Sequence, residues 1–273
     1  MYVEMSIIRA RMTSQAPTPA PKDWLWRPAL IVFVSNVCIM VMELVAGRMV
    51  APIIGVSLYT WTSIIGVILA GISLGNYIGG KVADRMASRR TLGAIFLLAG
   101  LGALSVLFTV EALGRSGLPT LAWMPLIGRM VVFITAIYFL PSALLGLISP
   151  VVIKLTLQDL KATGNVIGRI YAASALGSIV GTFATGYFLI SAFGTRVISL
   201  GVAALLIFMG LLLGQWVRSR AVTVAAAILI AAAGSVGFTQ AEGLRKYMDS
   251  GCTVESNYFC IKVRDETQDG KLY

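Results

Sequence analysis

The chain has 273 residues, of which 58% are hydrophobic and only 12% are charged. An average soluble domain is about 45–50% apolar and about 25% charged, and a soluble fold of this size cannot bury such an excess of apolar surface. The composition therefore excludes a disordered chain, a nucleic-acid-binding domain and an ordinary soluble enzyme. It indicates an all-α polytopic membrane protein whose main partner is the lipid bilayer.

Seven apolar segments approach the roughly 20 residues that a spanning helix needs. Residues 1–24 precede them and lack the short charged and apolar regions of a signal peptide, so we expect a flexible cytoplasmic tail there. A membrane domain then covers residues 25–240. The expected helices are Pro28–Val50, Leu58–Gly80, Leu92–Val110, Leu126–Val152, Ile167–Ile190, Val197–Val217 and Ala221–Phe238, the last being the shortest apolar run.

Lys and Arg are concentrated on one side of these helices. The N-terminal tail and the loops after the second, fourth and sixth helices contain thirteen of them, whereas the alternate loops contain four. Because cytoplasmic loops of membrane proteins carry the excess of Lys and Arg, we expect a cytoplasmic N-terminus. Seven crossings would place residues 241–273 outside the cytoplasm, and without the seventh helix they would lie inside.

An acidic side chain interrupts the first expected helix. Glu43 lies in the run CIMVMELVAGRMV, and a carboxylate at that depth is costly and marks a functional site by default. Its candidate partners are Arg48, on a different face of the same helix, and Arg129 near the outer end of the fourth. Two interpretations remain open: a structural ion pair, or a proton relay or ligand for a cationic substrate, with Asn76 of the second helix as a further substrate-binding residue.

Small residues recur at four-residue spacing in two of the helices. Residues four apart share one helix face, so such stripes let another backbone approach closely. The pattern indicates helix packing, and the alternative is a sliding or rocking interface in a transporter. The stripes are Gly71, Gly75 and Gly79 in the second helix and Ala173, Gly177, Gly181 and Thr185 in the fifth.

The loop between the second and third helices, GGKVADRMASRRTL, resembles the cytoplasmic loop motif of the major facilitator superfamily. The family's second glycine is replaced by Ala87. Together with a proline-containing fourth helix and a glycine-rich fifth, the first six helices resemble one half of a facilitator, in which the substrate site lies between two halves. The residues of the loop motif are Gly80, Asp84, Arg85, Arg89 and Arg90.

After Gly243 the sequence becomes polar, and alternating side chains followed by Asp269-Gly270 predict the start of a soluble β-hairpin. The run ESNYFCIKV resembles the opening hairpin of spermidine synthases (polyamine aminopropyltransferases), although Phe259 stands where that family commonly has glutamine. The run ELVAGRMVAPIIGVSLYTWTSIIGVILAGISLGNYIGGKVADR is similar to the membrane region that a group of bacterial proteins fuses to a spermidine-synthase-like domain. The positions that match the hairpin are Glu255, Ser256, Tyr258, Ile261 and Val263.

This resemblance implies a bacterial inner-membrane protein in which residues 25–240 anchor or serve an extracytoplasmic aminopropyltransferase-like domain beginning at residues 241–273. In the family, the glycine-rich loop for a decarboxylated S-adenosylmethionine-like nucleoside and the acidic residues for the amine follow the segment that matches here. We therefore expect no catalytic residue, cofactor, metal or aminopropyl transfer in this chain alone.

Other functions and one covalent link remain open. The chain could be a secondary transporter, acting as a homo-oligomer of facilitator halves that carries an amine on Glu43. It could also be an accessory subunit of a larger membrane complex. An extracytoplasmic tail permits a disulfide between Cys252 and Cys260, and two reduced thiols are the alternative.

Overall fold

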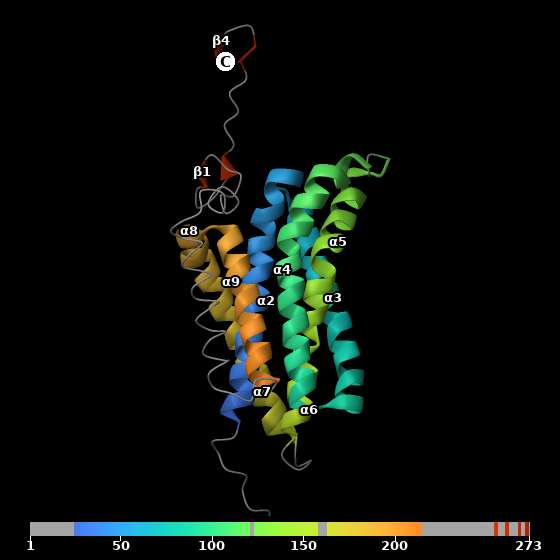
Figure 1. The fold of residues 1–273 in the computed structure, drawn as a ribbon, viewed down its shortest axis with the longest axis vertical. Helices are drawn as coiled ribbons and strands as arrows, with labels where there is room; N and C mark the ends of the chain where they lie inside the picture. Colours follow the sequence, from blue (N-terminus) through green and yellow to red (C-terminus); the bar gives the residue numbers. More distant parts are fainter. Residues whose placement is uncertain are drawn as a thin grey trace, which may run out of the picture.

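The computed structural model describes residues 25–120, 123–157 and 163–214, together with four short strands in the C-terminal segment. Within these residues, six spans are long and apolar enough to cross a membrane, and they stand side by side in an upright bundle (Figure 1). The polytopic all-α architecture and the first six predicted spans are therefore confirmed. The seventh predicted helix, Ala221–Phe238, lies outside the described residues.

The first five spans extend beyond the apolar runs that predict them, and the sixth begins two residues before its predicted start. Two spans are built from several pieces: α5 and α6 form the fourth, and α7, the π-helical turn η3 and α8 form the fifth. The extra turns at the ends of the spans stay helical because intrahelical hydrogen bonds also satisfy the backbone N–H and C=O groups in the polar interface. The elements are α2 (Trp26–Ile54), α3 (Leu58–Met86), α4 (Arg89–Thr120), α5 (Leu126–Gly146), α6 (Ile148–Thr156), α7 (Thr163–Ala184), η3 (Thr185–Leu189), α8 (Ile190–Phe193) and α9 (Thr195–Leu213).

The fourth span is interrupted between α5 and α6, at Leu147. Pro150 explains the interruption, because proline has no N–H to donate and its ring crowds the carbonyl four residues earlier, which belongs to Gly146. Leu147 itself keeps helical dihedral angles, with φ −62° and ψ −24°. The chain therefore crosses as one span with a local defect.

Two tight turns of the same design join the first three spans. Ser57 caps α3 by accepting a hydrogen bond from the Thr60 N–H at 3.1 Å, and the Thr60 hydroxyl donates to the Gly55 carbonyl at 3.1 Å. At the other end of α3, Ser88 accepts from the Thr91 N–H at 3.0 Å. A serine cap satisfies backbone N–H groups that a helix start leaves without partners, so these turns reverse the chain with few residues.

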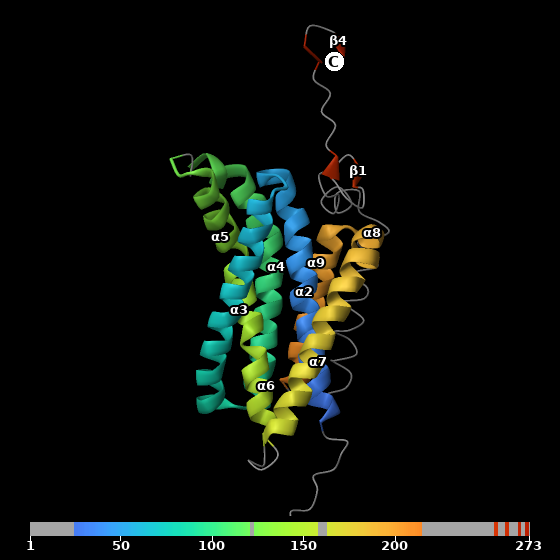
Figure 2. The ribbon, with the colours of Figure 1, turned by 180° about the vertical axis from the view of Figure 1, so that it is seen from behind.

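The spans form two interlocked triplets. The first consists of α2, α3 and α4, and the second of α5–α6, α7–α8 and α9. The main packing partners are α3 with α5, α2 with α7, and α4 with α9. Helices at the same position in the two triplets can be matched: α2 with α5–α6, α3 with α7–α8, and α4 with α9. Under this exchange the α3–α5 pair becomes the α7–α2 pair, and the α4–α9 pair becomes itself. Figure 2 shows α7 lying along α2, the second of these equivalent pairs.

The predicted glycine stripe of α3 lies at its contact with α5 and α6. A Cβ atom added to Gly79 would be 2.9 Å from the Leu147 Cα, and one added to Gly75 would collide with the Ala143 carbonyl group. Both obstacles are backbone, which cannot rotate away. The stripe therefore fixes how closely these two helices approach, as expected for helix packing in membranes.

The stripe of α7 plays the same part against α2. A Cβ added to Gly181 would be 2.8 Å from the Val37 carbonyl oxygen, and one added to Gly177 would collide with the Phe33 carbonyl. The α4–α9 pair uses glycine too, since a Cβ on Gly210 would be 2.8 Å from the Leu97 nitrogen. The stripes predicted from the sequence do not include this third contact.

In the C-terminal segment, β1 (Val254–Glu255) pairs antiparallel with β2 (Cys260–Ile261), and β3 (Thr267–Gln268) pairs antiparallel with β4 (Lys271–Leu272). Cys252, which precedes β1, and Asp269-Gly270, which joins β3 to β4, lie outside the described residues. The soluble domain and the disulfide between Cys252 and Cys260 therefore stay predictions.

Candidate functional site

Glu43 lies within the spanning part of α2, where its side chain is half-buried. The described part of the chain gives its carboxylate no hydrogen bond and no ion pair. The structural ion pair with Arg48 or Arg129 that the sequence suggests is therefore not formed there. A carboxylate within a span and without a described partner is consistent with the proton relay or cation-binding role predicted for Glu43.

The position of Glu43 on α2 follows from helical spacing. Asn36, Glu43 and Gly47 share one face, because they are separated by seven and four residues. An added Cβ on Gly47 would be 2.6 Å from Cη2 of Trp61, so α3 covers this face near the C-terminal end of α2. The Asn36 amide donates to the Val32 carbonyl of its own helix at 2.9 Å. Ile39 and Val50, four residues before and seven residues after Glu43, lie on the same face and are buried in the core. Glu43 therefore lies at the edge of the packed interior of the bundle.

The predicted partner of Glu43 in a substrate site is Asn76, which is exposed on α3. No hydrogen bond among the described residues joins the two side chains. Two residues that bind one substrate need no bond to each other, so a shared site of Glu43 and Asn76 stays a prediction.

Arg129, the other predicted charge near the outer side, is held close to the start of α5. Its Nη2 donates to the Met124 carbonyl at 3.3 Å, and its Nε is buried with no hydrogen-bond partner among the described atoms. Its described contact is thus with the loop before α5, and the carboxylate of Glu43 is not part of it.

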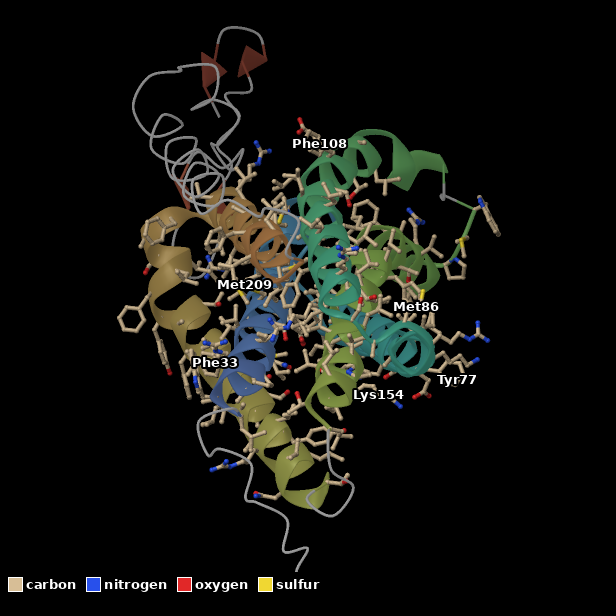
Figure 3. All side chains as sticks on the ribbon, turned by 60° about the horizontal axis from the view of Figure 1, so that its bottom comes forward. Phe33, Tyr77, Met86, Phe108, Lys154 and Met209 are labelled. Atoms are coloured by element: carbon tan, nitrogen blue, oxygen red, sulfur yellow. The ribbon has the colours of Figure 1, made fainter. Side chains whose placement is uncertain are left out.

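The loop motif contains an interaction that the sequence did not predict. Lys154 of α6 donates to Oδ1 of Asp84 on α3 at 2.8 Å. The two residues are 70 positions apart in the chain, and Figure 3 shows Lys154 at the end of the bundle that comes forward in that view. The bond ties the last turns of α3, the second helix of the first triplet, to the last turn of α6.

The remaining motif residues lie around this ion pair. Ala87, which replaces the family's second glycine, has φ −62° and ψ 100°, a conformation that alanine adopts without strain. A Cβ added to Gly80 would meet no atom within 4 Å. Three arginines of the motif are exposed, namely Arg85, Arg89 and Arg90.

The interior contains a cavity of about 10 Å³ between α2, α4, α5 and α9, a space of the size of one water molecule. Two hydroxyl groups point to the sulfur of Met49 beside it: Tyr138 donates at 3.9 Å and Ser199 at 3.3 Å. Tyr138 is otherwise surrounded by the apolar core. The arrangement is that of a packed core in which methionine fills an irregular space.

In the parts that the structure describes, no group of three His, Cys, Asp or Glu side chains lies close enough to hold a metal ion, and Cys38 is a buried free thiol. The arrangement can hold helices at fixed distances and can present Glu43 from a half-buried position. Comparisons with protein-family models, with curated proteins and with solved structures found no match to this chain.

Proposed function

We propose that residues 25–240 are a membrane domain that anchors a spermidine-synthase-like soluble domain, which begins at residues 241–273. The observation that carries this proposal is the change in composition from the apolar helix bundle to the polar segment that follows it. Eleven of the chain's 34 charged residues fall in its last 33 residues. The strand β2, at Cys260–Ile261, falls within the run ESNYFCIKV that resembles the opening hairpin of spermidine synthases.

The packing of the bundle suits an anchor. Three helix pairs meet through glycine at backbone-to-backbone distance, as at Gly79 against Leu147 and Gly181 against Val37. Close contacts of this kind fix the spacing between helices, because each helix meets rigid backbone instead of flexible side chains. A rigid bundle holds an attached domain at a defined height above the membrane surface.

The exchangeable triplets agree with the resemblance to half a facilitator, since facilitator halves are built from two three-helix repeats. The pairing of Asp84 with Lys154 gives the loop motif a concrete role in joining the two repeats. Both observations support a facilitator-like scaffold.

The gene downstream of codon 273 provides the direct test of the anchor. We expect a reading frame that continues into a strand, a glycine-rich turn and a helix able to bind a nucleoside. The protein made from that complete frame should transfer an aminopropyl group, and residues 1–273 alone should not. A stop codon at this point, or a continuation without the nucleoside-binding turn, would contradict the proposal.

The side of the membrane occupied by the tail can be tested by cysteine labelling. In a background without the three native cysteines, Asn257→Cys should react with an impermeant maleimide added to intact cells. Met86→Cys, at the exposed last residue of α3, is the matched control and should react only after lysis. Labelling of both positions only after lysis would show six crossings instead of seven.

The second candidate function is amine transport, and the half-buried Glu43 without a described partner favours it. Liposomes containing the purified protein should then accumulate labelled polyamine, and Glu43→Gln should abolish the uptake. Glu111→Gln, which removes a carboxylate from the outer part of α4, is the control and should retain uptake. If the wild-type protein takes up no polyamine, this candidate is wrong.

A further inference from the structure

The last turns of α3 extend beyond the apolar part of the bilayer. The helix has 29 residues, so it is about 43 Å long at 1.5 Å per residue, whereas the hydrocarbon core is about 30 Å thick. Tyr77, Lys81 and Arg85 follow one another at four-residue intervals near this end. They therefore form a single stripe along one face of the helix, at the level of the lipid headgroups.

The first two residues of the stripe contact each other. The Lys81 ammonium lies 4.3 Å from the centre of the Tyr77 ring, within the distance of a cation–π interaction. Tyr77 is 63% exposed, and Figure 3 shows it on the outer side of the bundle. Tyrosine is enriched at this depth because its ring contacts lipid while its hydroxyl stays in the polar layer.

The positive charge of the stripe is not balanced within the described chain. The acidic neighbour on α3 is Asp84, whose carboxylate is engaged by Lys154 from α6 at 2.8 Å. Neither Lys81 nor Arg85 makes an ion pair with a described residue. Two cations one helical turn apart, with an exposed aromatic ring beside them, thus face outward without a counter-charge.

We propose that Tyr77, Lys81 and Arg85 bind the phosphate of an anionic phospholipid in the leaflet next to the end of α3. The guanidinium of Arg85 offers paired N–H donors that match two phosphate oxygens. The ammonium of Lys81, positioned over the ring, adds a second charge-assisted contact. The Tyr77 ring contacts the glycerol and upper acyl region, which a soluble phosphate lacks, and this selects the lipid as the occupant.

Binding of phosphatidylglycerol to the purified full chain in neutral detergent, counted by native mass spectrometry, tests the proposal. A basic residue near an anionic headgroup contributes about fivefold in affinity, so Lys81→Gln/Arg85→Gln should weaken phosphatidylglycerol binding by about 30-fold. Arg89→Gln/Arg90→Gln removes the same charge from the adjoining turn and should keep at least a third of the wild-type affinity. Phosphatidylcholine should bind equally to all three proteins.

A second variant separates the site from general surface charge. Tyr77→Leu keeps both cations but removes the ring, and it should weaken phosphatidylglycerol binding severalfold while the protein stays monodisperse. The proposal is overturned if the two double variants lose affinity equally, or if Tyr77→Leu binds like the wild type. It is also overturned if inorganic phosphate at millimolar concentration displaces the lipid, because the site would then recognise free phosphate.

Discussion

The substitution Gly75→Ala tests the packing of α3 against α5 most directly. A Cβ at this position would collide with the Ala143 carbonyl oxygen, and it would lie 2.9 Å from the carbonyl carbon and 3.0 Å from the Gly146 Cα. Favourable contacts between carbon atoms lie at about 3.5–4.0 Å. The two helices would have to separate by roughly 1 Å, because every obstacle is backbone of the partner helix.

The free energy of unfolding follows from two terms of opposite sign. Overpacking of a well-packed contact costs about 1–3 kcal/mol, whereas replacing a helical glycine by alanine contributes about 0.5–1 kcal/mol of helix propensity. Gly66→Ala on the same helix has open space around the new Cβ and gains only the second term. The difference between the two variants therefore isolates the collision, and we expect Gly75→Ala to be less stable by about 1–3 kcal/mol.

Thermal unfolding in detergent, followed by loss of the monodisperse peak in size-exclusion chromatography, measures this difference. We expect Gly66→Ala to unfold at or above the wild-type temperature, and Gly75→Ala several degrees below it. The equivalent comparison on α7 is Gly177→Ala against Gly168→Ala, whose Cβ also has open space. If Gly75→Ala and Gly66→Ala unfold at the same temperature, α3 and α5 do not meet at backbone distance and the interlocked arrangement is wrong.

Two further predictions concern side-chain contacts. Asp84→Asn should reduce the free energy of unfolding by less than about 1 kcal/mol, because both partners of the ion pair are at least half exposed. The exchange Asp84→Lys/Lys154→Asp should restore the coupling in a double-mutant cycle of unfolding temperatures. A coupling of zero would show that the ion pair is absent. Tyr138→Phe should leave the unfolding temperature nearly unchanged, because its hydroxyl has only a 3.9 Å contact with the Met49 sulfur, whereas Tyr138→Ala should cost about 3 kcal/mol by leaving a cavity. Equal stability losses in these two variants would mean that the hydroxyl, and not the ring, stabilises the core.

The glycine stripes were recognised from spacing alone, and their role in helix packing agrees with the structure. What spacing could not supply was the partner of each stripe. Gly75 and Gly177 lie in helices with similar patterns, yet one meets Ala143 and the other meets Phe33. The contact at Gly210 was missed although Gly214 follows it at four residues, because a single pair is shorter than the stripes of α3 and α7.

The candidate site was predicted less completely than the fold. The sequence identified Glu43 because a carboxylate in an apolar run is conspicuous, but it suggested an ion pair that the described residues do not form. It read Asp84 as part of a loop motif and did not identify Lys154 as its partner. The disulfide between Cys252 and Cys260 and the seventh helix stay predictions, because Cys252 and Ala221–Phe238 lie outside the described residues.

The sequence by itself determined that the chain is a membrane protein, where its first six spans lie and which helix faces carry small residues. Each of these is a property of one segment, because a spanning helix satisfies its own backbone hydrogen bonds and needs only enough apolar length. Only the tertiary structure decided that α3 packs on α5 and α7 on α2, that Lys154 binds Asp84, and that Lys81 and Arg85 keep their charge facing outward. These depend on the fit between segments far apart in the chain, and in a bilayer that fit, more than apolarity, selects the partner of each helix.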